Sequence, residues 1–340
     1  MIDRSEMKAF RAVAHAGAGM ADPTDRVGAH PGSVLAHLDR PRAAERTRLA
    51  VIADPHVATR ADGTSKLFEH TRTHLRGAVA DIRDRGVDAV LSVGDLTKDG
   101  EPWNYDAVDD ILDALDVPFY AVPGNHDVPK AGDDHDTMPV SAFADRYSPT
   151  GQLPFVVEVG DVPVVGVNSS GSEDVLYDSH DGRVTAADVA WLADTLPELA
   201  DPILLTHFNL PAMSEQLREH RDHVEPEMAI PPVLRDPQPF VDVLADNDVP
   251  LMVTGHLHLP STATQQGVRE VMAPTTCSFP QAYLLVDVGP SGTTVRQIPC
   301  TDHAGLRTGF SERLTDTVTS RGLTAMAAVR CADFPLVDER

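Results

Sequence analysis

The chain has 340 residues with a net charge of −24, and its 42% hydrophobic content is enough for a folded core. The 52 acidic residues outnumber the 28 basic ones, which excludes a general nucleic-acid binder because such proteins need basic stripes. No apolar run approaches the about 18 residues that cross a bilayer, and the start MIDRSEMKAF lacks a signal-peptide pattern, so we expect a cytoplasmic protein without a membrane partner.

The charged residues are unevenly chosen, with 38 Asp and 14 Glu against 24 Arg and only 4 Lys. Like charges at this density repel one another unless salt screens them, and at molar salt the Debye length falls to about 3 Å. The composition therefore predicts a halophilic protein, and the alternative is an acidic protein of ordinary conditions. The 3 cysteines, Cys277, Cys300 and Cys331, are far apart and indicate neither a disulfide framework nor a thiolate metal site.

Residues 1–48 show no clear periodicity, and we expect an irregular or partly helical N-terminal extension there. Strands and helices alternate from residue 49 onward. Apolar runs predict strands at 49–53, 87–93 and 117–122, and apolar residues three and four apart predict helices within 65–85 and 101–115. This β-α-β-α-β order implies parallel strands with right-handed crossovers.

The second half of the chain continues with shorter elements. We expect a hairpin over 155–159 and 162–167, a helix over 185–196 that begins with a near-match to a capping box at Thr185 and Asp188, a strand at 202–206, a helix at 240–245, a strand at 249–254 and a strand meander to about residue 299. Residues 300–340 are expected to be a C-terminal extension. Three segments without regular pattern, 128–149, 169–183 and 210–239, are expected to rim a pocket.

Polar side chains follow the predicted strands at the point where each ends. They are Asp54 and His56, Asp95, Asn125 and His126, His207, and His256 and His258. Ligands of α/β sheets bind beyond the carboxyl ends of the strands, so these residues are expected to converge. In an extended segment residues i and i+2 point the same way, which would pair Asp54 with His56 and His256 with His258. The glycines Gly94, Gly124 and Gly255 permit tight backbone at these tips.

Each of these features has a plainer explanation when taken alone. Asp-x-His occurs often on surfaces, Gly-Asp is an ordinary turn, Asn-His-Asp suits a solvated turn, and His207 suits a satisfied core position. Two histidines two apart, as in GHLH, rarely serve packing. Their joint occurrence, in order and at successive strand ends, favours a metal site.

The ordered motifs DPH, GD, GNHD, a downstream His and GHLH resemble those of the calcineurin-like metallophosphoesterase superfamily. The motifs span residues 54–258, and the strand and helix order extends the likeness over residues 49–299, which would form the metallophosphoesterase domain. The resemblance implies an α/β fold, a four-layer αββα sandwich of two mixed β-sheets flanked by helices. It also implies a two-metal centre at one end of the sheets.

The same resemblance assigns roles to the site residues. One metal would be held by Asp54, His56, Asp95 and His258, and the other by Asp95, Asn125, His207 and His256, with Asp95 as the bridge. A donor set of imidazole, carboxylate and amide without thiolate suits two divalent ions of Mn, Fe, Zn, Co or Ni. Two such ions would activate a bridging hydroxide for attack on a phosphoester.

His126 is expected to be a catalytic residue that faces the substrate, where it stabilises the transition state or protonates the leaving oxygen. For Asp127 two roles are open. It either accepts a hydrogen bond from His126 and fixes the tautomer of that ring, or it stabilises the turn.

Two positions depart from the patterns of related enzymes. Lys98 stands where the purple acid phosphatases have a tyrosine, so a coloured Fe(III)–tyrosinate centre is not expected. Phe208 stands where many members have a second histidine. The basic residues Arg218, Arg221 and Arg235 either reach a phosphate or balance the acidic surface, and His135, His180, His220 and His223 are expected to be solvated loop residues.

The segment GDLTKDGEPWNYDAV resembles the branch that contains the class III cyclic-nucleotide phosphodiesterases. We therefore expect metal-dependent hydrolysis of a small phosphodiester, with cyclic nucleotides among the candidates. The alternatives are a phosphomonoesterase or protein phosphatase with the same centre, and a non-catalytic scaffold that keeps the fold. The intact ligand set argues against the scaffold, and the sequence does not predict an oligomeric state.

Overall fold

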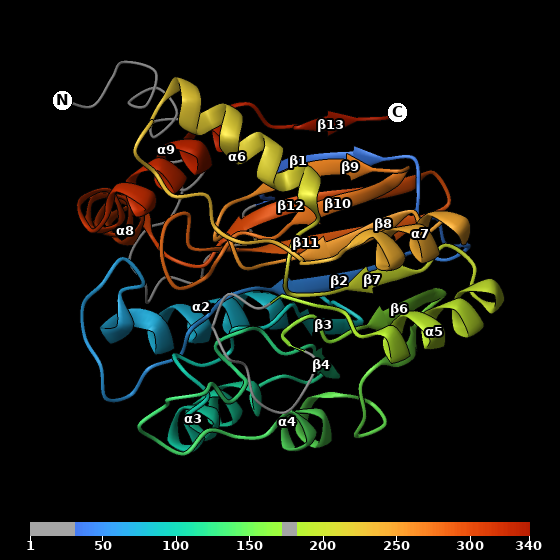
Figure 1. The fold of residues 1–340 in the computed structure, drawn as a ribbon, viewed down its shortest axis with the longest axis horizontal. Helices are drawn as coiled ribbons and strands as arrows, with labels where there is room; N and C mark the ends of the chain where they lie inside the picture. The colour runs from blue at the N-terminus through green and yellow to red at the C-terminus, as the bar shows by residue number, and fades with distance from the viewer. Residues whose placement is uncertain (1–30, 172–181) are drawn as a thin grey trace.

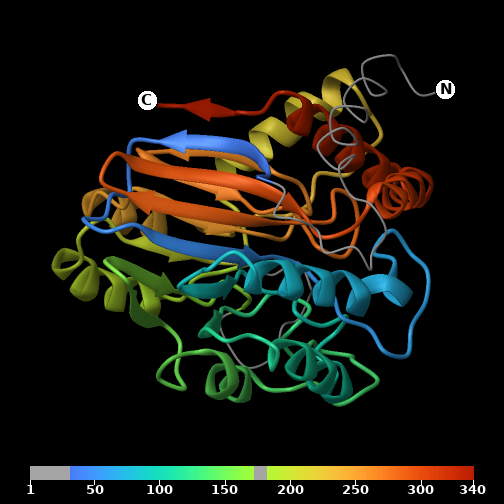
Figure 2. The same ribbon diagram turned by 180° about the vertical axis from the view of Figure 1, so that it is seen from behind.

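The computed structural model describes residues 31–171 and 182–340, which form two β-sheets packed face to face (Figures 1 and 2). The seven-stranded sheet runs in the order β13 (Val337–Asp338), β1 (Ser33–Leu38), β12 (Gly292–Pro299), β11 (Ala282–Gly289), β2 (Thr47–Ile52), β3 (Ala89–Ser92) and β4 (Phe119–Ala121). The six-stranded sheet runs in the order β5 (Phe155–Val159), β6 (Val162–Gly166), β7 (Ile203–Leu205), β8 (Leu251–Thr254), β10 (Val268–Met272) and β9 (Ser261–Gln265).

Both sheets are mixed, as the resemblance implied. In the seven-stranded sheet β2, β3 and β4 are parallel, whereas β11 and β12 pair antiparallel. In the six-stranded sheet β6, β7, β8 and β10 are parallel, and the edge strands β5 and β9 pair antiparallel. The parallel strands bring their carboxyl ends to one edge of the sandwich, and that edge carries the predicted site.

Alternation along β2 shows how the layers form. Leu49 and Val51 point into the core between the sheets, while Ala50 and Ile52 point outward and pack on the buried face of α2 (Thr71–Arg83). Helices α3 (Pro102–Leu112) and α4 (Val140–Tyr147) cover the same outer face. Helices α5 (Ala186–Thr195) and α7 (Gln238–Asp246) cover the outer face of the six-stranded sheet. The predicted four-layer αββα arrangement is confirmed.

A third group of helices packs at one end of the six-stranded sheet. It comprises α6 (Pro211–His223), α8 (His303–Thr315) and α9 (Val318–Ala332), which share an apolar cluster with residues near β9 and β10. Short 3-10 helices, η1 (Phe68–His70) and η2 (Leu196–Glu198), adjoin α2 and α5. Within the described residues, none of the helices combines the length and the apolar character that crossing a membrane would need.

The structure corrects three expectations about irregular segments. Residues 33–38 form a strand of the main sheet, although an irregular or helical extension was predicted over 1–48, because their pairing partner β12 lies far away in sequence. Helices α4 and α6 lie in the segments 128–149 and 210–239, where no regular structure was expected. The helix predicted from residue 65 begins as η1 at Phe68, since Thr64 and Leu67 adopt left-handed backbone.

Candidate active site

The residues predicted to bind metal come together just past the ends of β2, β3, β4, β7 and β8. Asp54, His56 and His207 are fully buried, and Asp95 is 1% exposed. Buried ionisable and polar groups at this density are stable only when they pair with one another or with a ligand. The sheet edge is therefore a built polar site rather than a solvated turn cluster.

The backbone at this edge is left-handed at five of the seven predicted ligands. The φ angles are 48° at Asp54, 43° at His56, 54° at Asp95, 73° at His256 and 57° at His258. The expectation that Asp54–His56 and His256–His258 lie in extended segments is therefore wrong, because a left-handed residue interrupts the alternation of side chains. Each such residue costs about 1–3 kcal/mol of folding free energy, and this kind of strain clusters at functional sites.

The first group of donors consists of Asp54, His56, Asp95 and His258, whose ligand atoms all lie within 4.8 Å of one another. His56 Nε2 lies 3.0 Å from His258 Nε2 and 3.4 Å from Asp95 Oδ2. His258 Nε2 lies 3.4 Å from Asp54 Oδ1. Two imidazole nitrogens and two carboxylates that converge in this way fit a divalent cation.

The second group also contains Asp95 and consists otherwise of Asn125, His207 and His256. Asp95 Oδ2 lies 3.4 Å from His207 Nε2, and Asn125 Oδ1 lies 2.9 Å from that nitrogen and 3.1 Å from His256 Nδ1. Thus Asp95 stands between the two groups, as a bridging ligand would. His256 faces the second group and His258 the first, so the same-side pairing expected of an extended segment is wrong, whereas the resemblance had placed these histidines in separate groups.

Backbone carbonyls fix the tautomers of two of these rings. His207 Nδ1 donates to the carbonyl of Val93 at 2.8 Å, and His256 Nε2 donates to the carbonyl of Pro232 at 3.1 Å. The other nitrogen of each ring is therefore the one that faces Asn125. A carbonyl-held imidazole is the usual second contact of a metal-ligating histidine.

The ionisable side chains of the cluster shift one another's pKa values. Burial opposes ionisation of Asp95, but the imidazoles of His207, His126 and His56 lower its pKa well below the ordinary value. Burial likewise opposes protonation of His207, but the Asp95 carboxylate raises its pKa to about 9. Burial and then the Lys66 charge lower the pKa of His56 well below the ordinary range. The cluster thus keeps its carboxylate bridge ionised.

Close backbone approach explains two of the glycines. A Cβ on Gly124 would lie 2.1 Å from Asp95 Oδ1, and one on Gly94 would lie 2.3 Å from the Gly124 nitrogen. The loops after β3 and β4 therefore touch at these glycines, as the sequence predicted for tight tips.

The structure separates the roles of His126 and Asp127. Asp127 is fully buried and accepts hydrogen bonds from the backbone N–H groups of Leu96, Thr97 and Gly124. It ties the two loops together, so the predicted hydrogen bond from His126 to Asp127 is wrong and the turn-stabilising alternative is the observed one. His126 Nδ1 instead donates to the carbonyl of Lys98 at 2.8 Å and lies 3.3 Å from Asp99 Oδ1.

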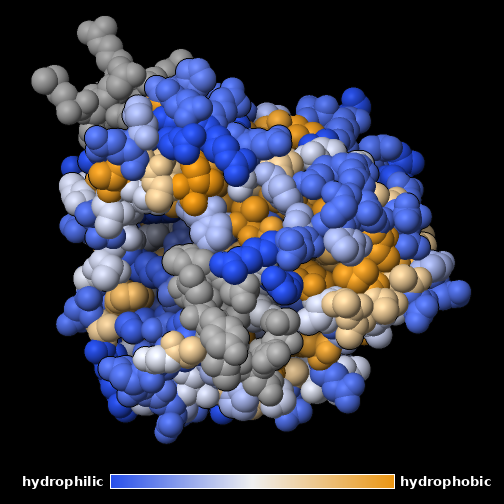
Figure 3. Space-filling model, viewed as in Figure 1, coloured by the Kyte–Doolittle hydropathy of each residue, from blue (hydrophilic) through white to orange (hydrophobic). Residues whose placement is uncertain are grey.

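A cavity of about 630 Å³ opens onto the cluster, and Figure 3 shows a hollow on this side of the molecule. Its polar end presents Asp95, Asn125, His126 and the ammonium of Lys66. Its other walls come from the chain before α7 and from α9, at Ala229, Ile230, Pro231, Pro232, Thr317, Thr319, Ser320 and Leu323. The rim segment 210–239 does contribute to the pocket, but the wall from α9 was not predicted.

Several residues weighed from the sequence lie elsewhere. Arg218, Arg221 and Arg235 do not line this cavity, and Arg235 lines a separate pocket beside α5 and α7. His220 and His223 donate to backbone carbonyls, His135 lies near Asp99, and His180 lies outside the described residues. Phe208 stacks on His256 with ring centroids 4.3 Å apart and so fills the place beside the ligand. Lys66 and Asp99 were not singled out, because no motif marks them.

Comparison with known proteins agrees with this geometry. The sequence model of the calcineurin-like phosphoesterases matches residues 47–260. A probable cyclic nucleotide phosphodiesterase of Psychrobacter arcticus is 25% identical over 193 residues, which is 56% of this chain and 63% of that protein. The match thus spans less than two thirds of that relative's length.

Two further similar proteins, one found by sequence and one by structure, are matched over most of their length. A cAMP/cGMP dual specificity phosphodiesterase of Mycobacterium tuberculosis is 26% identical over 249 residues, 71% of this chain and 72% of that protein. Among solved structures, a dimetal phosphatase of Danio rerio superimposes with a TM-score of 0.55 at 15% identity, over 75% of this chain and 97% of that one. At this identity the structural likeness establishes the fold alone.

Proposed function

Because this chain belongs to the calcineurin-like phosphoesterases, a family of hydrolases that act on phosphoester bonds, we propose that it is a metal-dependent phosphodiesterase for a small phosphodiester. The names of its relatives in Psychrobacter arcticus and Mycobacterium tuberculosis support a diester, with cyclic nucleotides among the candidates. The observation that carries the proposal is the convergence of two donor groups on the shared carboxylate of Asp95.

In this proposal, Asp54, His56, Asp95 and His258 hold one divalent cation, and Asp95, Asn125, His207 and His256 hold a second. The donor set is compatible with Mn, Fe, Zn, Co or Ni. Such ions, when bound, lower the pKa of water and neutralise charge on phosphoryl oxygens. The buried imidazoles of His207 and His256 support this assignment, because backbone carbonyls hold one nitrogen of each ring and turn the other nitrogen inward.

His126 would act on the substrate directly. Its Nδ1 proton is committed to the Lys98 carbonyl, so Nε2 is the nitrogen left to face the cavity that His126 lines. When Nε2 is protonated as well, the imidazolium would donate a hydrogen bond from Nε2 to a phosphoryl or leaving-group oxygen and pass that proton to the leaving group.

The apolar end of the cavity would hold the organic group of the ester. Ile230, Leu257 and Leu323 line this end. The whole cavity has a volume of about 630 Å³, and small-molecule sites typically measure about 300–1,000 Å³. A macromolecular phosphoprotein would need an open surface around the metals instead.

A substrate panel at high salt tests the proposal. Metal-loaded protein is assayed with two diesters, bis-p-nitrophenyl phosphate and cyclic AMP, and with the monoester p-nitrophenyl phosphate. The diesters are expected to be hydrolysed faster than the monoester. Faster turnover of the monoester would favour the phosphomonoesterase alternative, and no turnover of any ester would favour the scaffold.

A further inference from the structure

Lys66 brings a positive charge to the site from a loop that no motif marked. Its Nζ lies 3.1 Å from His126 Nε2 and 3.3 Å from His56 Nδ1, and the residue lines the cavity. Among residues 31–171 and 182–340, no carboxylate lies within the 4.0 Å of Nζ that an ion pair requires. The chain has only 4 lysines and a net charge of −24, so a partly buried ammonium without an ion pair is unusual here.

The loop is built to hold this side chain in place. The backbone N–H of Ser65 donates to the carboxylate of Asp316 at 3.3 Å, and that of Lys66 donates to Thr64 Oγ1 at 3.1 Å. Thr64 and Leu67 adopt left-handed backbone with φ of 63° and 53°, and the Leu67 side chain is buried. A strained turn anchored on both sides of Lys66 thus presents its ammonium to the cavity.

We propose that Lys66 binds a non-bridging oxygen of the substrate's phosphoryl group, beside His126. Burial of an ammonium group costs free energy unless the group pairs with an anion. Charge-assisted hydrogen bonds to phosphate oxygens are strong. The arginines of the rim segment do not line the cavity, and Arg313, which does line it, donates to backbone carbonyls. Lys66 therefore supplies the charged donor beside His126. This inference rests on the proposed function for its substrate, but it concerns phosphate binding and is testable without turnover.

Calorimetric titration of metal-loaded protein with inorganic phosphate tests Lys66 directly. A hydrogen bond to a charged group contributes about 1.5–3 kcal/mol, so Lys66→Met is expected to weaken phosphate binding about 10-fold to 100-fold. Lys66→Arg is expected to recover part of the loss, since it keeps the charge. The control is Arg72→Gln, which makes the same charge change at an exposed position six residues away on α2.

Metal content and turnover complete the test. All four proteins are expected to bind equal metal, and in diester hydrolysis Lys66→Met is expected to raise KM more than it lowers kcat. Wild-type phosphate affinity in Lys66→Met, loss of metal from that variant, or an equal loss in Arg72→Gln would each overturn the inference. If the wild type binds phosphate through Lys66 but hydrolyses no diester, the proposed function fails and the inference about Lys66 stands.

Discussion

Asp99 is the acidic partner of His126, although it lies four residues past Asp95 and outside every motif. Its Oδ1 lies 3.3 Å from His126 Nδ1 and 2.7 Å from Lys130 Nζ. Burial opposes its ionisation, but these two hydrogen bonds hold the pKa of Asp99 well below the ordinary value. Burial and the Lys66 charge lower the pKa of His126 below its ordinary value, and the Asp99 carboxylate partly opposes that shift.

Replacement of Asp99 is expected to impair His126 without loss of metal. In Asp99→Asn the pKa of His126 falls, so the alkaline limb of the pH–rate profile moves to lower pH. We expect kcat to drop about 10-fold, which is less than the about 10²–10⁴-fold that general acid catalysis contributes, because His126 itself remains. The control Asp133→Asn removes a carboxylate that contacts the Lys130 backbone and Thr137 instead. An unshifted alkaline limb in Asp99→Asn would show that Asp99 does not act through His126.

Glu270 is a buried acid that serves the fold near His207. It accepts hydrogen bonds from Asn209 Nδ2, Thr254 Oγ1 and the Leu210 N–H, and it holds the loop that follows β7. Burial raises the pKa of Glu270 from 4.5 to about 7. The folded state thus favours the protonated form, and this contribution to stability is present below pH 4.5 and disappears as the pH rises to about 7.

Glu270→Gln is therefore expected to gain stability relative to wild type between pH 4.5 and about 7, because the amide resembles the protonated acid and does not titrate. The gain is at most about 1.4 kcal/mol per pH unit in that window and constant above it. Chemical unfolding of both proteins at pH 5 and pH 8, at one salt concentration, measures the difference. A difference in unfolding free energy that is the same at both pH values would rule out the ionisation of Glu270 as the cause.

Helix α8 supports the loop that carries His256 and His258. Arg313 on α8 is 3% exposed, and its guanidinium donates to the carbonyls of His258, at 2.6 Å, and of Phe279. Burial lowers the pKa of Arg313 to about 10, which leaves it charged at neutral pH. Helix α8, from the C-terminal part of the chain, therefore contacts the loop that forms part of the site.

Arg313→Met is expected to weaken metal binding about 10-fold, in line with the loss of outer contacts at other metal sites. The reason is that the carbonyls of the His258 loop lose their donor while the ligands themselves are unchanged. Arg307→Met, on the exposed face of the same helix, is the control. Metal affinity by competition with a chelator measures the effect, and equal affinities in the two variants would contradict a bracing role.

The helices and strands that could be predicted from the sequence are those whose apolar residues recur at a regular helical or strand spacing. The strands around β2 and the helix α2 have such patterns, and the donors at their ends follow recognisable motifs. Helices α8 and α9 were missed because glycines interrupt them, and these glycines serve packing, since a Cβ on Gly309 or Gly322 would lie 2.8 Å from Gln281 or 2.5 Å from Met228. The left-handed backbone of the site and the partner of His126 depend on contacts across the fold, which the spacing of residues does not reveal.

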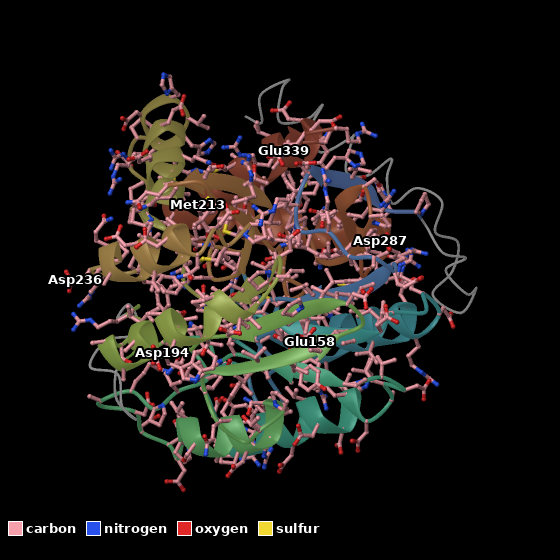
Figure 4. The ribbon with its side chains drawn as sticks, turned by 90° about the vertical axis from the view of Figure 1, so that its right-hand side faces the viewer. Glu158, Asp194, Met213, Asp236, Asp287 and Glu339 are labelled. Atoms are coloured by element: carbon pink, nitrogen blue, oxygen red, sulfur yellow. The ribbon has the colours of Figure 1, made fainter. Side chains whose placement is uncertain are left out.

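Ion pairs between aspartates and arginines are spread over the described part of the chain. Asp287, labelled in Figure 4, contacts Arg46, Arg48 and Arg296, and Glu339 pairs with Arg269. Ion pairs at a protein surface contribute about 0–1 kcal/mol each. They therefore leave most of the repulsion from a net charge of −24 to be screened by salt.

The halophilic hypothesis makes a prediction about stability. We expect the midpoint of thermal unfolding to rise between 0.1 and 2 M KCl, because salt at these concentrations shortens the Debye length from about 10 Å toward about 3 Å. Circular dichroism during heating measures it, with sucrose at equal osmolarity as the control for effects other than screening. Unfolding promoted by KCl, with stability in dilute buffer, would show that the protein is merely acidic.

A titration of metal-free protein with Mn²⁺ at high salt, with bound metal and hydrolysis of bis-p-nitrophenyl phosphate followed together, tests the two-metal proposal most directly. Activity is expected to rise until two equivalents per chain are bound, and His126→Ala is expected to bind the same metal with a large loss of turnover. Full turnover without bound metal, or binding that leaves the activity unchanged, would contradict the two-metal proposal.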